Sequence, residues 1–310
     1  MLISSVFKAK ARAALKQHWQ TALLIALIVN LPTLLVQGLA SFTGSDALAR
    51  TEEMLLQASA GNISMDTLTG SLQAMMAESG VIAMAGLGIL AWLVTPALAA
   101  GMDHWTLERL RGRELPVSAV FSRLRIFFKS IGLRLLIILK VLLWMLPGFA
   151  VSLVSVFFIF RSAPQTTEDL LSAANLSTQF MSFGIIAMLV LGIMGYLYCA
   201  IADLILADEP EEGALSCIRR SKTLMKGRRG KLMSLMLSFL LWYLLIIILS
   251  SVVGEISGSV VAILAEMLGS LSLSVYMLAT KGAFYEALRK MPLPDIPADQ
   301  PPADSPDSEL

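Results

Sequence analysis

The stretch DEPEEGALSCIRRSKTLMKGRRGKLMSLMLSFLLW, residues 208–242, decides the fold of this chain. It begins with four acidic residues, continues with seven basic residues up to Lys231, and is apolar from there on. An acidic first turn and basic last turns suit the dipole of a helix, and Gly227 is placed to end it. An amphipathic helix that leads at once into an apolar segment of this length is typical of membrane proteins. We therefore expect a helix on the membrane surface, followed by a transmembrane helix.

The rest of the chain is as apolar as this stretch suggests. Hydrophobic residues make up 56% of it and charged residues 15%, whereas a soluble domain is about one quarter charged. Six segments are long and apolar enough to cross a bilayer; they occupy approximately 21–40, 80–102, 131–160, 180–206, 232–253 and 258–280. The predicted fold class is all-α: a polytopic membrane helical bundle of six transmembrane helices with amphipathic interfacial helices. The first segment also resembles a signal peptide, but its length favours an uncleaved span.

Lysine and arginine are distributed unevenly among the segments that connect these spans. The amino end carries four, the second-to-third connection six, the fourth-to-fifth connection seven, and the segment after span six three. The remaining connections carry one, one and none. Because basic residues accumulate in cytoplasmic loops, we expect a multi-pass protein with both termini in the cytoplasm.

The basic residues before the odd-numbered spans recur with the same spacing. The three sets are Lys10, Arg12 and Lys16, then Arg123, Arg125 and Lys129, then Arg220, Lys222 and Lys226. In each set a large apolar residue precedes the last basic one, and a span follows shortly after. This pattern predicts three units, each a basic interfacial helix with a transmembrane hairpin, over roughly 1–103, 104–208 and 209–290. Dense basic clusters also match by chance, so a bundle without an internal repeat is the alternative.

The chain otherwise divides simply. We expect a single six-span membrane domain over residues 1–290. Its first connection, 41–79, is polar, contains Arg50 as its one basic residue, and is predicted to be an extracytoplasmic loop. Residues 291–310 are rich in proline and acid, which predicts a disordered cytoplasmic tail.

The nine basic residues of the three sets are the predicted contacts to lipid headgroups. Anionic lipid attracts a nearby lysine or arginine by about 1 kcal/mol, so three basic helices would hold the chain to an anionic surface. Nucleic acid is not expected as a partner, because these residues lie beside apolar spans where anionic lipid is the nearer polyanion. The sequence identifies neither a protein partner nor an oligomeric state.

One acidic residue, Glu266, lies well inside span six. An acid near mid-bilayer costs roughly 2.5–3.5 kcal/mol on insertion scales, so it should face protein or a water-filled cavity. Lys140 and Asn30 are its nearest candidate partners in depth. These three residues form a candidate intramembrane polar site. It is either part of a proton or substrate path, or a packing contact in which the acid is protonated or hydrogen-bonded.

No catalytic motif stands out in the sequence. A membrane-embedded lipid enzyme would require Asp103, His104 and Asp203 to converge at the cytoplasmic ends of their spans. Glu108, one turn after His104, adds only a weak metal-binding signal. Phosphate-binding loops, nucleophile elbows and zinc-binding helix motifs do not occur in the sequence. We therefore expect no catalytic residue, no metal, no cofactor and no enzymatic activity.

Three parts of the sequence resemble a known family. They are SKTLMKG (221–227) with LSFLLW (237–242), KARAALKQHW (10–19) and AFYEALR (283–289). They are similar to an uncharacterised family of bacterial integral membrane proteins, domain of unknown function nine-hundred-seventy-five. The long acidic first loop and the Pro-rich tail depart from the family pattern. The resemblance implies a location in the bacterial cytoplasmic (inner) membrane and brings no known activity.

These observations favour an integral membrane protein of unknown biochemical function. The leading hypothesis is a non-enzymatic scaffold, accessory or envelope-homeostasis factor that contacts anionic lipids. The alternative is a small transporter or channel with a polar pathway near Glu266, Lys140 and Asn30.

Overall fold

The computed structural model describes residues 4–43, 66, 67, 69, 70, 79–162, 167–257 and 259–291. Within these residues the chain is helical and contains no strand. The elements are α1 (Ser4–Leu15), α2 (Trp19–Thr43), α5 (Ser79–Leu110), the 3₁₀ helix η1 (Val117–Ile126), α6 (Phe127–Ser162), α7 (Thr167–Cys199), α8 (Ala202–Asp208), α9 (Ala214–Leu224), α10 (Arg229–Ser257) and α11 (Ser259–Arg289). Most of the predicted loop 41–79 and nearly all of the predicted tail 291–310 lie outside the described residues.

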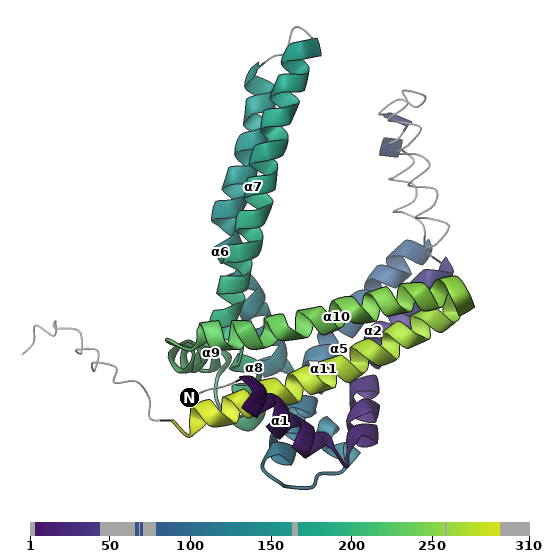
Figure 1. The fold of residues 1–310 in the computed structure, drawn as a ribbon, viewed down its shortest axis with the longest axis vertical. Helices are drawn as coiled ribbons and strands as arrows, with labels where there is room; N and C mark the ends of the chain where they lie inside the picture. Colours follow the sequence, from purple (N-terminus) through teal and green to yellow (C-terminus); the bar gives the residue numbers. More distant parts are fainter. Residues whose placement is uncertain are drawn as a thin grey trace, which may run out of the picture.

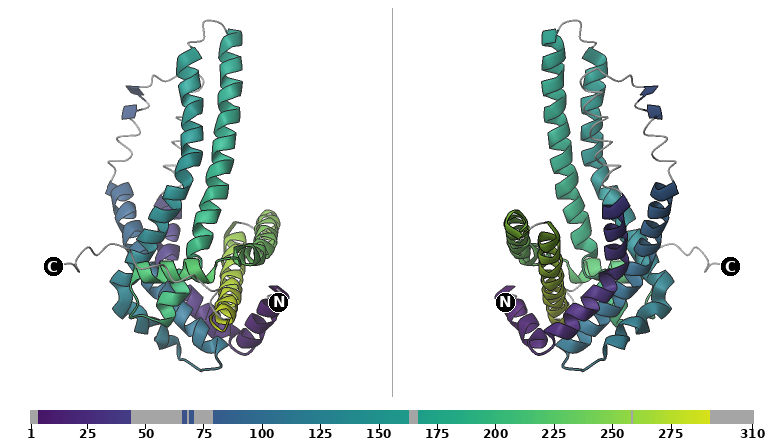
Figure 2. Two further views of the ribbon diagram at one scale, coloured as in Figure 1. Left: turned by 90° about the vertical axis from the view of Figure 1, so that its left-hand side faces the viewer. Right: turned by 90° about the vertical axis from the view of Figure 1, so that its right-hand side faces the viewer.

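Six of these helices are long and apolar enough to cross a membrane, which confirms the predicted multi-pass helical bundle. They pair as three hairpins, α2 with α5, α6 with α7, and α10 with α11. The hairpins diverge from a common base: α6 and α7 stand upright in Figure 1, while α10 and α11 run together toward the side. In Figure 2 the α10–α11 hairpin is seen almost end-on beside the upright α6–α7 hairpin.

Lipid is the natural solvent for the surface of the long helices. Large apolar side chains such as Leu139 and Leu143 of α6 and Leu241 of α10 are more than half exposed in the single chain. A helix satisfies its backbone hydrogen bonds internally, so such a surface is stable in hydrocarbon. The predicted bounds of spans five and six leave a short connection at residues 254–257, where a turn is expected, but α10 continues to Ser257. The prediction was wrong because a helix that stays hydrogen-bonded costs less in lipid than an early turn.

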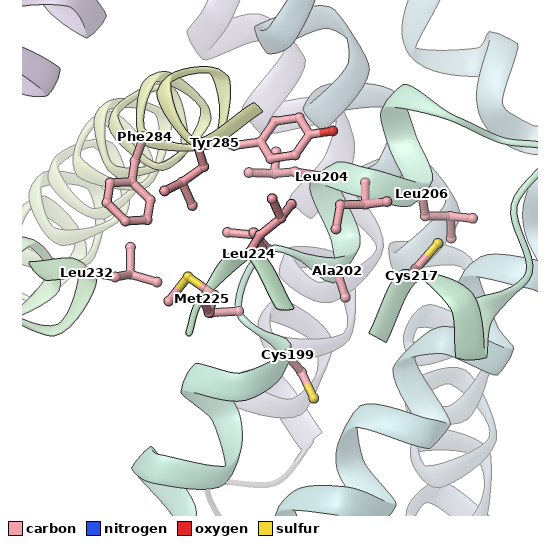
Figure 3. Packing of buried hydrophobic residues seen from close by; sticks show 14 of the residues in the cluster. Cys199, Ala202, Leu204, Leu206, Cys217, Leu224, Met225, Leu232, Phe284 and Tyr285 are labelled. Carbon is pink, nitrogen blue, oxygen red and sulfur yellow. The ribbon is translucent and has the colours of Figure 1, made fainter. Parts of the chain in front are cut away.

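The buried core lies at the base of the hairpins, where the short helices gather. Each of α1, η1 and α9 directly precedes a long helix, and α8 continues α7 after a turn at Ala200 and Ile201. Figure 3 shows side chains of α8, α9, α10 and α11 converging there, among them Leu204, Leu224, Leu232 and Tyr285. We call this side of the molecule the basic end, because all nine basic residues of the three predicted sets belong to it or adjoin it.

Helix α1 buries an apolar row with a spacing of four residues, which consists of Phe7, Ala11 and Leu15. Phe7 makes an edge-to-face contact with Phe284 of α11, with ring centroids 5.4 Å apart. The Tyr276 hydroxyl of α11 donates a hydrogen bond of 3.4 Å to the carbonyl of Lys8. A helix in the lipid interface, as predicted for this segment, would turn its apolar row toward lipid, whereas the structure packs the row on protein. The face of α1 that remains free to contact lipid is therefore the basic one, on which Arg12 is exposed.

Helices α6 and α7 approach each other closely at two glycines, Gly148 and Gly184. A Cβ atom built on Gly148 would stand 2.5 Å from the backbone nitrogen of Met188. A Cβ atom on Gly184 would overlap the Ser152 side chain. Small residues allow backbones to pack closely in lipid, where association depends on such contact rather than on a hydrophobic driving force.

Replacing Gly148 by valine should therefore loosen the α6–α7 hairpin. The added side chain has no room against the Met188 backbone, and overpacking of this kind costs roughly 1–3 kcal/mol. Thermal unfolding of the purified protein in detergent measures the loss. Gly132→Val on the same helix is a matched control, because nothing lies within 4 Å of a Cβ atom at that position. Equal losses in the two variants would contradict the assignment.

Candidate functional site

A cavity of about 270 Å³ lies where the three hairpins meet near the basic end. Helices α2, α5, α6, α7, α8 and α11 all contribute to its wall. The charged lining residues are Asp103, Arg134, Asp203 and Lys281. The uncharged polar lining residues are Asn30, Ser130, Tyr196 and Ser274. We call it the charged cavity.

The charged residues come from helix ends. Asp103 lies near the carboxyl end of α5 and Lys281 near that of α11, and they are 7% and 9% exposed. Asp203 is half-buried in the first turn of α8, where the helix dipole favours a carboxylate. Arg134, in the second turn of α6, is exposed on one side and reaches the cavity on the other.

These four charges lack direct partners among the residues that the structure describes. The charges of Lys281, Asp203 and Arg134 all act on the Asp103 carboxyl. Nevertheless, within the described part of the chain, none of the four side chains takes part in a hydrogen bond or an ion pair. The buried Ser130 hydroxyl has no hydrogen-bond partner either. Because burial of an unpaired charge is costly, such a wall suits a ligand with complementary groups.

Next to the cavity, Arg111 joins the ends of α5, α8 and α11. Its guanidinium donates hydrogen bonds of 2.7 and 2.9 Å to the two oxygens of Asp208 at the end of α8. It donates at 2.9 and 2.6 Å to Glu286 on α11, and at 2.9 Å to Glu108 on α5. The side chains of the three acids are only 7–8% exposed. The hydrogen bonds to Asp208 raise the pKa of Arg111 above its ordinary value, against the opposing effect of burial.

Further groups complete this arrangement. Arg113 donates a 2.9 Å hydrogen bond to the second oxygen of Glu108, and Arg289 donates one of 2.9 Å to Asp208. The Tyr285 hydroxyl also donates to Asp208, at 3.1 Å. Three arginines thus balance three carboxylates. The seven residues form what we call the Arg111 cluster: Glu108, Arg111, Arg113, Asp208, Tyr285, Glu286 and Arg289.

The cavity and the cluster are related by a spacing that the sequence interpretation missed. Each of three helix ends carries a charged residue that lines the cavity, followed five positions later by an acid that binds Arg111. The pairs are Asp103 with Glu108, Asp203 with Asp208, and Lys281 with Glu286. Five residues correspond to a rotation of about 140° around a helix, so the two members of a pair face different sides. Each pair lies at or just after the end of the second span of a hairpin, although Glu108 already lies beyond the predicted end of the first unit at residue 103. The repeat of whole units stays a prediction.

The structure separates the three residues of the predicted intramembrane polar site. Asn30 lines the charged cavity, whereas Glu266 and Lys140 are not among its lining residues. Glu266 is exposed on the surface of α11 in the single chain, and Lys140 is half-buried on α6. The expectation that Glu266 faces the interior was based on depth alone, and depth does not determine which side of a helix a residue occupies. A functional role for Glu266 stays a prediction.

Asp103 and Asp203 do converge, whereas His104 does not join them. Adjacent residues on a helix point about 100° apart, and His104 is not among the residues that line the cavity with Asp103. Its Nδ1 atom lies 3.0 Å from Nη2 of Arg123 instead. Within the described residues, no group of three or more histidine, cysteine, aspartate or glutamate side chains is arranged to hold a metal ion.

The nine predicted lipid contacts fall into two groups. Three of them are used within the protein: Arg123 at His104, Lys129 at the carbonyls of Pro210 and Glu211, and Arg220 at Glu209 and Glu212. The other six are exposed: Lys10, Arg12, Lys16, Arg125, Lys222 and Lys226. The middle residues of the sets, Arg12, Arg125 and Lys222, are exposed in all three.

Comparison with known proteins identifies a family for this chain but no individual relative. A family model described as Protein of unknown function (DUF975) matches residues 1–292. No match to the chain was found among curated proteins or among solved structures. The match covers nearly the whole chain, including the predicted acidic first loop.

Removal of the central guanidinium should destabilise the fold strongly. Arg111→Gln leaves three buried carboxylates without their shared partner, and breaking a buried ion pair costs roughly 3–5 kcal/mol. Thermal unfolding in detergent at neutral pH measures the effect. Arg113→Gln is the control, because that side chain is 72% exposed and bonds only to Glu108. Because Arg113 is largely exposed and Glu108 keeps its bond to Arg111, the Arg113 contact should contribute at most about 1 kcal/mol. Similar losses in the two variants would show that Arg111 is not central.

Acid should weaken the ion pair between Arg220 of α9 and Glu209, which precedes this helix. Arg220 donates to both oxygens of Glu209, at 2.5 and 3.0 Å, and this lowers the pKa of Glu209 below its ordinary 4.5. A lowered carboxyl pKa contributes stability that is complete above pH 4.5 and disappears as the pH falls through the lowered value. The melting temperature of the wild type should therefore exceed that of Glu209→Gln near neutrality, and the two should converge in acid.

Glu211→Gln is the matched control for this pair. The Glu211 side chain is exposed and has no ion-pair partner among the described residues. Its removal should leave the melting temperature close to that of the wild type throughout the same pH range. A constant difference between wild type and Glu209→Gln, independent of pH, would contradict the proposed linkage.

Proposed function

The chain belongs to the DUF975 family, and we propose that it is a non-enzymatic scaffold of the bacterial cytoplasmic membrane, attached to anionic lipid by its basic end. The observation that carries this proposal is the exposure of basic side chains on three short helices whose apolar faces pack on protein. On α9, for example, Cys217, Ile218 and Leu224 are buried while Lys222 is exposed. The short helices are thus firmly held, and their basic groups point outward.

Electrostatic attraction to the membrane supports both the attachment and the orientation. Anionic lipids are concentrated on the cytoplasmic leaflet, and each nearby basic residue contributes about 1 kcal/mol of attraction. The basic end would therefore lie at the cytoplasmic surface, with both termini on that side. The Arg111 cluster supports a scaffold role, since it fixes three hairpins to one another at this surface. Anionic headgroups would be the partners of the exposed residues.

A small transporter is the second candidate, and the charged cavity is the observation that favours it. This cavity reaches from Asp103 and Lys281 at the basic end to Asn30 within α2. A transporter requires a polar path of this kind through the hydrocarbon region. A solute flux in proteoliposomes that is lost on Asp203→Asn, a change in the wall of this cavity, would favour the transporter over the scaffold.

The lipid attachment predicts a loss of bound anionic lipid when two exposed arginines are neutralised. The double variant Arg12→Gln with Arg125→Gln should retain less phosphatidylglycerol in its bound lipid shell. At about 1 kcal/mol for each residue, the expected loss is roughly fivefold per substitution. Mass spectrometry of the lipids that remain with the full-length protein after extraction in polymer nanodiscs measures this enrichment.

A double variant with the same change in charge provides the control. Arg50→Gln with Arg161→Gln removes two arginines from the connections that are predicted to lie on the opposite side of the membrane. Its bound phosphatidylglycerol should match that of the wild type. If both double variants lose anionic lipid equally, or if neither loses any, then the basic end does not attach the protein to anionic lipid.

A further inference from the structure

A second cavity, of about 440 Å³, adjoins the charged cavity and shares two lining residues with it, Asn30 and Ser274. Most of its other lining residues are apolar; they include Met236, Phe239, Leu240, Leu271, Leu273 and Met277. Leu240 and Met277 are 49% and 36% exposed, so this cavity opens on the surface that faces lipid. We call it the apolar groove. The two cavities together are charged at one end and apolar at the other.

We propose that the charged cavity and the apolar groove bind one zwitterionic phospholipid, with its phosphate and ammonium groups in the cavity and an acyl chain in the groove. This site is distinct from the exposed basic residues on which the proposed function rests. Its walls are formed by the long helices and α8, not by the outward faces of α1 and α9.

The charges of the cavity match such a headgroup. Lys281 and Arg134 provide two cations for a phosphate, and Asp103 and Asp203 provide two carboxylates for an ammonium group. Asp103 and Lys281 are each more than nine-tenths buried, and neither bonds to any side chain that the structure describes. A ligand of a single charge would leave two of the four groups without a counterpart. A zwitterion pairs with all four, and charged hydrogen bonds of this type are the strong ones.

The residues between the two cavities suit the ester region of a lipid. The Asn30 amide donates one N–H to the carbonyl of Ala26 at 2.8 Å and keeps a second N–H for another acceptor. Ester carbonyls accept hydrogen bonds but do not donate them. Along α11 the order is Lys281, Ser274 and then Ser270, which extends over roughly 16 Å at 1.5 Å per residue. The site therefore runs along the helix from the basic end toward mid-bilayer, as an embedded lipid does.

The headgroup is tested by the preference of the full-length protein between two lipids. Delipidated protein in detergent is titrated with short-chain phosphatidylethanolamine and, separately, with short-chain phosphatidylglycerol, which lacks the ammonium group. Native mass spectrometry or a thermal shift gives the dissociation constants. We expect the wild type to prefer phosphatidylethanolamine by about tenfold, the scale of one hydrogen bond to a charged group. Asp103→Asn should remove most of this preference.

Asp103→Asn is nearly isosteric and removes a buried charge, so it should fold. The ratio of the two dissociation constants is in any case independent of the folded fraction. Glu266→Gln, which neutralises an exposed acid of α11, is the control and should keep the wild-type preference. A wild type without preference, or an Asp103→Asn variant that keeps it, would overturn the headgroup assignment.

The acyl chain is tested by filling the groove. Leu240→Trp should weaken binding of phosphatidylethanolamine about tenfold and leave any binding of the soluble headgroup, O-phosphoethanolamine, unchanged. Leu241→Trp is the control, since Leu241 is 71% exposed and does not line the groove. If O-phosphoethanolamine binds as tightly as the lipid and Leu240→Trp has no effect, then the ligand is a soluble zwitterion and the lipid assignment fails. Loss of anionic lipid from the Arg12 and Arg125 double variant would still stand as a separate result.

Discussion

The shared binding of three buried carboxylates by Arg111 is the interaction on which the arrangement of the hairpins depends. The three carboxylates belong to Glu108, Asp208 and Glu286 and come from three hairpins. Without Arg111 between them, these like charges would repel one another. A planar guanidinium with five donors is the side chain that can bond to all of them at once, whereas a lysine presents a single compact charge. Because these bonds lie beside the charged cavity, they also determine how its walls are spaced.

Hydropathy and charge were enough to predict the architecture. The apolar segments are longer than a soluble core requires, and their length predicts the six spans. The basic residues that cluster before every second span predict the short helices there. The role of those short helices was harder to infer. The row of Phe7, Ala11 and Leu15 shows that α1 has an apolar face, but an apolar face packs equally well on lipid or on protein. Only the position of α11 decides between them.

The polar site was predicted less well, for a reason that concerns helix faces. Glu266 was expected to face the interior because it lies deep in a span, and yet it is exposed on α11 in the single chain. Asp103 and Asp203 were considered only together with His104, as the cluster that a lipid enzyme would require, and Lys281 was counted among the basic residues after span six. A comparison of the three helix ends would have revealed charged residues five positions apart in each. Whether these residues meet, however, depends on how each helix is rotated about its own axis. A lipid-embedded helix is apolar on all sides, so its sequence does not show which side faces the protein.

Attachment of the hairpins at one end has a mechanical consequence. Helix α6 has 36 residues and is therefore roughly 54 Å long. Figure 1 shows α6 and α7 leaving the base in a different direction from α10 and α11. Each hairpin is thus fixed at one end, in the core that the short helices form, and extends away from it. By simple geometry a tilt of α6 by about 5° at its fixed end moves its far end by about 5 Å. A small change in helix tilt around Arg111 would thus produce a large displacement of the helix ends on the opposite side of the membrane.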